Sequence, residues 1–147
     1  MSNESHASNG IAHATLPAPT SSDVLQSYYD DKLANVRQQF PRLAQQLRAV
    51  GIICVEVHYD GVGDSGQIEF IEFYDKARRV PFPKCHVSLT EEQIMDLFYD
   101  LSQVRHPGWE NEDGAFGDFR WDVVSDELAH AHHDRYTDYQ TTEHEGL

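Results

Sequence analysis

Residues 52–75 form two runs of β-branched and aromatic residues on either side of a six-residue loop, 61–66, that contains three glycines. This pattern is typical of a β-hairpin whose connection is longer than the two-residue minimum. It is the strongest local structural signal in the chain. The loop also holds an acid and a hydroxyl group, Asp64 and Ser65.

Two registers of this hairpin are compatible with the sequence. Pairing Tyr59 with Ile68 places acidic and histidine side chains together along one face. Slipping the strands by one residue instead opposes Glu56 and Glu72, and such a like-charge pair costs stability unless another group bridges it. The residues alone leave both registers open.

Apolar residues recur at near-helical spacing over residues 24–50, after a capping sequence at 21–23. Pro41 interrupts this stripe, and proline removes a helical hydrogen bond and clashes with the preceding turn. We therefore expect either a kink or two helices that separate near residues 39–40. Gly51 is expected to end the helical stretch.

A second helix is predicted over residues 91–103, where Thr90 caps the first turn and Gln93 completes a capping box. The proline-containing segment 80–83 is expected to be an extended connector or an edge. Residues 118–124 and 128–135 predict a second hairpin across 125–127. The order helix, strand, strand, helix, strand, strand predicts an α+β domain: a four-stranded, mainly antiparallel sheet of two hairpins with helices packed on one face.

The chain of 147 residues is long enough for one domain. Residues 1–20 are small and polar and are expected to be a disordered tail, residues 21–138 the single α+β domain, and residues 139–147 a frayed polar tail. No apolar run approaches the roughly 20 residues of a membrane span, and the N-terminus lacks the pattern of a signal peptide. With only two cysteines, we expect reduced thiols and a cytoplasmic protein.

The net charge is −14, and from residue 105 onward eleven acids stand against three bases. Such a surface repels phosphate backbones and attracts basic surfaces. We therefore expect no direct binding to nucleic acid and no association with a membrane. The expected partner is a protein with a basic surface.

The second hairpin has a histidine-rich strand. If Val124 pairs with Leu128, Trp121 and its alternate neighbours face the core together with two alanines of the partner strand. The opposite face then carries Asp122, His130 and His132, which together are able to hold Zn²⁺ or another divalent ion. The alternative is a solvated sheet face on which these groups form cross-strand charge pairs.

The glycine-rich loop and the loop before the second hairpin are expected at the same end of the sheet. Their polar residues would then form a rim beside an aromatic ring, which suits a cationic partner. The predicted binding residues are Asp64, Ser65, Trp109, Glu110, Asn111 and Asp113. In the rival interpretation, Asp64 and Asn111 only cap their own turns.

Three segments, GVGDSGQIE, WENEDGAFGDF and RYTD, occur in this order. Taken together they resemble a bacterial domain family of unknown function that is met on chromosomes and plasmids. The resemblance extends over about residues 28–145. It implies a bacterial cytoplasmic protein and carries no activity or catalytic residue.

Three hypotheses about function follow. The first is a small acidic protein-binding module with a regulatory or accessory role, which needs no cofactor. The second is a metal-dependent hydrolase that uses Asp122, His130 and His132, where an open metal position activates water. The third is a structural subunit of a larger assembly, indicated by Tyr28, Tyr29, Trp109 and the aromatic-rich strands. The alternative is that these aromatic residues belong to the core.

Overall fold

The computed structural model describes residues 20–63, 65–111, 113–136 and 141–146. Within them the chain forms two helices, α2 (Ser21–Ala49) and α3 (Glu91–Arg105), and five strands. The strands are β1 (Cys54–Val62), β2 (Ser65–Tyr74), β3 (Arg79–Val80), β4 (Ala115–Asp122) and β5 (Glu127–Asp134). Neither of these helices has the combination of length and apolar character that crossing a membrane requires.

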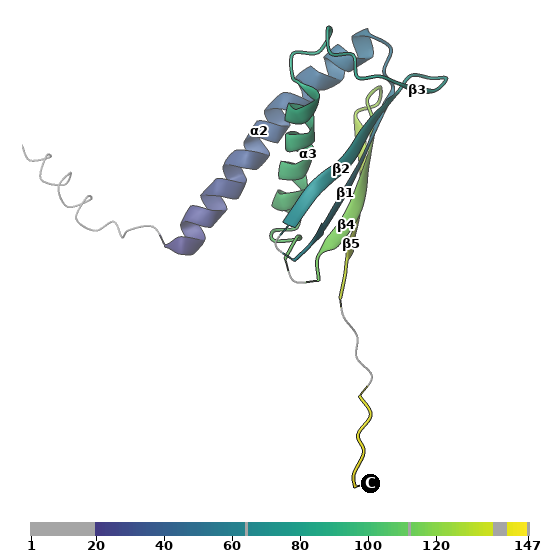
Figure 1. Cartoon of the computed structure of the whole chain (residues 1–147). Coiled ribbons are helices and arrows are strands. Elements are labelled where there is room, and N and C mark those ends of the chain that lie inside the picture. Colours follow the sequence, from purple (N-terminus) through teal and green to yellow (C-terminus); the bar gives the residue numbers. More distant parts are fainter. Residues whose placement is uncertain (1–19, 64, 112, 137–140, 147) are drawn as a thin grey trace, which may run out of the picture.

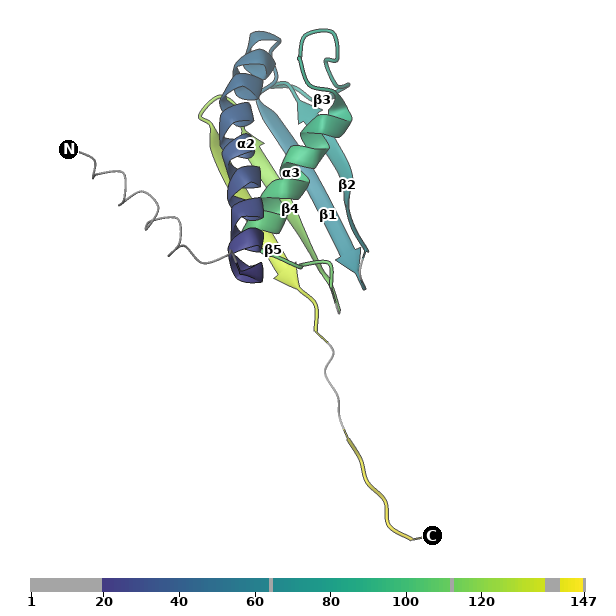
Figure 2. The same ribbon diagram turned by 90° about the vertical axis from the view of Figure 1, so that its left-hand side faces the viewer.

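The strands form one antiparallel sheet in the order β3-β2-β1-β4-β5, and both helices cover the same face of it (Figures 1 and 2). The expected α+β architecture with helices on one face is therefore confirmed, but the sheet has five strands instead of four. The additional strand is Arg79–Val80, which pairs with the end of β2. Two residues are too few to produce a recognisable strand pattern in the sequence. Pro81 and Pro83, which come just after them, prevent the strand from continuing.

Helix α2 is a single helix that continues through Pro41. Of the two expected arrangements, a kink or two separate helices, the second is wrong. The helix loses one backbone hydrogen bond at the proline, and burial of Val36, Leu43 and Leu47 against the sheet and α3 holds it together on both sides. Gly51 ends the helix as expected: its φ is +86°, and Ile52 N–H donates to the Leu47 carbonyl in a Schellman arrangement.

Helix α3 begins as predicted. Thr90 accepts a hydrogen bond from the Gln93 amide, and the Gln93 side chain accepts one from the Thr90 amide. The predicted apolar stripe is the buried face of the helix: Ile94, Leu97, Phe98 and Leu101. In α2, the same capping box is formed by Thr20 and Asp23, so Thr20 is the N-cap and the helix starts at Ser21.

The first hairpin contains both of the registers that the sequence allowed. Tyr59 pairs with Ile68 near the turn, whereas Glu56 pairs with Glu72 farther along. A β-bulge between His58 and Tyr59 separates the two segments, with Glu69 as the extra residue. The bulge lets each half of the hairpin keep its own apolar face toward the helices.

The opposed carboxylates of Glu56 and Glu72 are each neutralised by a different arginine. Arg120 on β4 contacts Glu56, and Arg79 on β3 contacts Glu72. Arg79 and a hydrogen bond from Tyr74 lower the pKa of Glu72. Each neighbouring strand therefore supplies the bridging charge that this register requires.

The register predicted for the second hairpin is wrong. Trp121 pairs with Leu128, Phe119 with His130, and Gly117 with His132. The turn spans four residues after Asp122, with Asp126 at a φ of +57°, instead of the three residues expected. His130 and His132 therefore lie on the helix-covered face, and Ala129 and Ala131, which alternate with them, lie on the open face.

Candidate functional site

The turn after β1 and the segment before β4 meet at one end of the sheet, which is the lower end in Figure 1. Trp109 fills the space between them. Its indole ring lies against Gly61 and Gly66, and a Cβ atom on Gly66 would be 2.8 Å from the ring. The two loops therefore form one packed unit, because glycine at both positions leaves room for the indole.

The Trp109 side chain belongs to the core and not to an exposed rim. It is 4% exposed and its ring contacts Tyr59 and Tyr99, with centroids 4.8 and 5.8 Å away. Its Nε1–H is buried and has no hydrogen-bond partner among the described residues. Trp109 thus positions the two loops by packing between them, and it does not offer its ring to a partner.

Arg135 fixes this end of the sheet from the opposite side. Its guanidinium makes a bidentate ion pair with Asp60, at 2.8 and 3.1 Å, and donates to the carbonyls of Gly61 and Ala115. The hydrogen bond and charge of Arg135 lower the pKa of Asp60. Arg135, the residue after β5, therefore connects the end of β1 to the start of β4 and holds the adjoining loops in place.

A cavity of about 470 Å³ opens between the N-terminal half of α2, the end of α3 and these loops. Two of the predicted binding residues, Ser65 and Glu110, line it. The Glu110 carboxylate accepts a 3.0 Å hydrogen bond from the Tyr99 hydroxyl and one from the Gln103 amide. The remaining lining residues are Tyr28, Tyr29, Lys32, Gly66, Tyr99, Asp100 and Gln103.

Lys32 already places an ammonium group in this cavity. Its Nζ lies 3.0 Å from an Asp100 carboxylate oxygen and 4.8 Å from the centre of the Tyr28 ring. Burial acts against the charged form, but the hydrogen bond and the charge of Asp100 outweigh it and raise the pKa of Lys32. The cavity walls therefore stabilise a cation.

The other predicted rim residues have different positions. Asn111 and Asp113 line a neighbouring cavity of about 450 Å³, together with Arg105, His106 and Asp134 among others. Asp64 lies outside the described residues.

The sequence analysis did not predict that α2 and α3 contribute to the site. The i,i+4 spacing of Tyr28 with Lys32 and of Tyr99 with Gln103 is a signal that could have indicated it.

The structure does not bring Asp122 to the histidines. Asp122 accepts hydrogen bonds from the amides of Val124 and Ser125 at 3.0 and 3.1 Å, so it caps its own turn. His130 and His132 instead approach His106, which follows directly after α3. One ring nitrogen from each of the three histidines lies within 4.8 Å of the other two.

A chain of hydrogen bonds defines the protonation of two of these imidazoles. Arg105, which only donates, lies 2.9 Å from His130 Nδ1, so His130 carries its proton on Nε2 and donates to the Tyr59 hydroxyl at 2.7 Å. Tyr59 then donates to His132 Nδ1 at 2.5 Å, and His132 Nε2–H donates to Asp134 at 3.0 Å.

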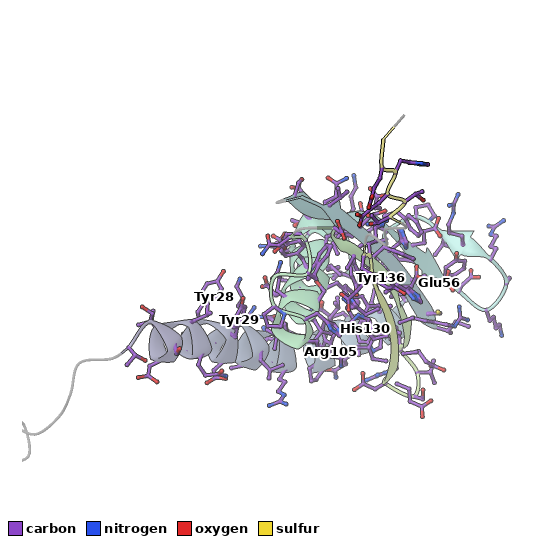
Figure 3. The ribbon with its side chains drawn as sticks, turned by 90° about the horizontal axis from the view of Figure 1, so that it is seen from below. Tyr28, Tyr29, Glu56, Arg105, His130 and Tyr136 are labelled. Atoms are coloured by element: carbon purple, nitrogen blue, oxygen red, sulfur yellow. The ribbon has the colours of Figure 1, made fainter. Side chains whose placement is uncertain are left out.

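The surroundings of His130 and His106 favour their neutral forms. Burial and the neighbouring charge of Arg105 lower the pKa of His130 to about 4, and burial also lowers the pKa of His106. Burial and nearby carboxylates raise the pKa of Tyr59, so its hydroxyl keeps its proton. Figure 3 shows Arg105 beside His130, and Tyr28 and Tyr29 on the part of α2 that projects beyond the sheet.

A family model described as a family of unknown function, DUF6878, matches residues 36–146. The chain belongs to DUF6878. No curated protein and no solved structure has detectable similarity to the chain. The DUF6878 match includes the sheet, α3, both loops and the three clustered histidines, but it starts within α2, after Tyr28, Tyr29 and Lys32.

Proposed function

We propose that this DUF6878 protein is a small binding module that accepts a lysine or arginine side chain of a basic partner protein in the cavity beside Glu110. The position of Lys32 carries the proposal, because the chain's own ammonium group lies against a carboxylate and a tyrosine ring in that cavity. Glu110 offers a second carboxylate in the same cavity, held in place by Tyr99 and Gln103.

The charge of the whole molecule favours the same class of partner. A net charge of −14 attracts basic proteins over long range and repels nucleic acid. Tyrosine rings and carboxylates together recognise ammonium and guanidinium groups. Both cysteines are free thiols, which suits a reducing compartment such as a bacterial cytoplasm.

Titration of the full chain with hexalysine tests the role of Glu110. Glu110→Gln keeps the side-chain shape and its capacity to accept hydrogen bonds but removes the charge. We expect binding to weaken about tenfold, because a hydrogen bond to a charged group contributes about 1.5 kcal/mol and 1.4 kcal/mol corresponds to a factor of ten. Calorimetry at two salt concentrations measures the effect.

Glu127→Gln is the matched control, since it removes the same charge at the opposite end of the sheet. Equal weakening by both substitutions would show attraction to net charge alone and would contradict the proposed cavity.

Lys32→Met gives an independent result. This substitution removes the chain's own ammonium group from Asp100 and Tyr28. Hexalysine should then bind more tightly if one of its lysines takes that place, and unchanged affinity would show that hexalysine does not contact Asp100 and Tyr28.

A further inference from the structure

We infer that His106, His130 and His132 form a binding site for a divalent transition-metal ion of the zinc class. The three imidazoles come from two separate elements, the end of α3 and strand β5, and each places a ring nitrogen within 4.8 Å of the others. The proposed recognition of a basic partner uses none of them.

The chemistry of the donors selects the ion. Neutral imidazole binds Zn²⁺, Co²⁺, Ni²⁺ and Cu²⁺ well, whereas Mg²⁺ and Ca²⁺ require oxygen ligands. Three histidines leave a fourth position of a tetrahedral ion available. The adjacent cavity of about 450 Å³, which His106 and Asp134 also line, gives that position access to solvent.

The burial of His132 and its hydrogen bond to Asp134 resemble the support that metal-binding histidines receive. His132 is almost buried, with 6% of its side chain exposed, and donates its Nε2–H to Asp134. A carboxylate on the remote nitrogen of a ligating histidine fixes the ring and directs its other nitrogen to the ion. That other nitrogen, His132 Nδ1, faces the Tyr59 hydroxyl, to which His130 Nε2 also points.

Binding requires a specific local change. The rings of His106 and His132 are stacked in parallel, 3.7 Å apart, so one of them has to turn before both lone pairs reach one ion. His130 must move its proton from Nε2 to Nδ1, and Arg105 must then leave Nδ1 because both groups would be donors. The Tyr59 hydroxyl must also turn its hydrogen away from His132 Nδ1, whose lone pair it occupies. Arg105 is exposed and is free to turn into solvent.

The role of Arg105 makes the inference sharply testable. Its positive charge and its hydrogen bond both compete with a cation at His130. Arg105→Gln should therefore bind Zn²⁺ more tightly than the natural chain, an effect that a purely structural histidine cluster would not produce. The measurement is calorimetric titration of the full chain, purified without a histidine tag and stripped with a chelator.

The ligand variants should have the opposite effect. His106→Ala should abolish Zn²⁺ binding or weaken it more than the substitution Asp134→Asn, for which we expect a roughly 10–100-fold loss. Substituting Co²⁺ adds a direct readout, because four-coordinate Co²⁺ absorbs strongly in the visible range and this absorption should disappear in His106→Ala. His106 is only partly buried, so its variant is expected to fold, and circular dichroism checks this.

His133→Ala is the matched control. It lies beside His132 in sequence but on the other face of β5, stacked on Phe116. The inference is overturned if the natural chain does not bind Zn²⁺, or if His133→Ala reduces binding as much as His106→Ala does. It is also overturned if Arg105→Gln and His106→Ala both leave the affinity unchanged. Hexalysine binding should be unaffected by His106→Ala, so the two sites are tested separately.

Discussion

Replacing Gly114 with alanine is expected to destabilise the protein severely. A Cβ atom at this position would lie 2.7 Å from the Val62 Cα and closer still to the Gly61 carbonyl oxygen, so it would push apart two backbone segments that no rotamer change can separate. Gly114 also has a φ of +82°, where an L-residue is strained by about 1–2 kcal/mol. Urea unfolding should show a loss of roughly 4 kcal/mol or more.

Gly51→Ala separates strain from steric overlap. Gly51 has a similar φ, +86°, but no atom lies within 4 Å of the position of its Cβ. This variant should therefore lose only about 1–2 kcal/mol from backbone strain. If Gly114→Ala cost no more than Gly51→Ala, the close approach of the two loops would not exist in solution.

Trp121→Ala is expected to destabilise the protein by about 3–5 kcal/mol, the usual cost of removing a large aromatic side chain from a core. Trp121 is 1% exposed, and its ring stacks on Phe40 of α2 with centroids 5.0 Å apart. Its Nε1–H also donates to Asp126 at 3.0 Å. The substitution would therefore loosen both the contact with α2 and the turn after β4.

Val124→Ala on the same turn provides the comparison. Val124 is 61% exposed, so this change should stay within about 0.5 kcal/mol of the natural chain. Trp121→Phe should have an intermediate cost, since it keeps most of the ring contact and loses the hydrogen bond to Asp126. Equal stability of Trp121→Ala and Val124→Ala would contradict the packing of α2 on β4.

Local chemistry was sufficient to predict where the helices lie and which segments form four of the five strands, but not the continuity of α2 through Pro41 or the register of the second hairpin. The capping box of Thr90 and Gln93, the apolar stripe of α3 and the stop at Gly51 each depend on residues close in sequence. The burial of Trp121 was predicted for the same reason, because alternation along β4 identifies its apolar face without reference to the neighbouring strand.

The position of the histidines was not predictable in this way. On β5, alanines alternate with His130 and His132, and polarity alone directs the alanines inward. The inward position of the histidines depends on Tyr59 and Arg105, which are distant in sequence and satisfy the ring nitrogens. His130 also stacks on Phe119 at 4.1 Å. Only the tertiary arrangement makes burial of these polar groups favourable.

The two walls of the cavity beside Glu110 have different relations to the rest of the molecule. Tyr99, Gln103 and Glu110 belong to the packed domain, so substitutions there should affect stability as well as the proposed recognition. Tyr28 and Lys32 lie on the projecting half of α2, before the region that the family model matches. Tyr28 is 54% exposed, so substitutions on this half-helix should change the wall of the cavity at little cost in stability.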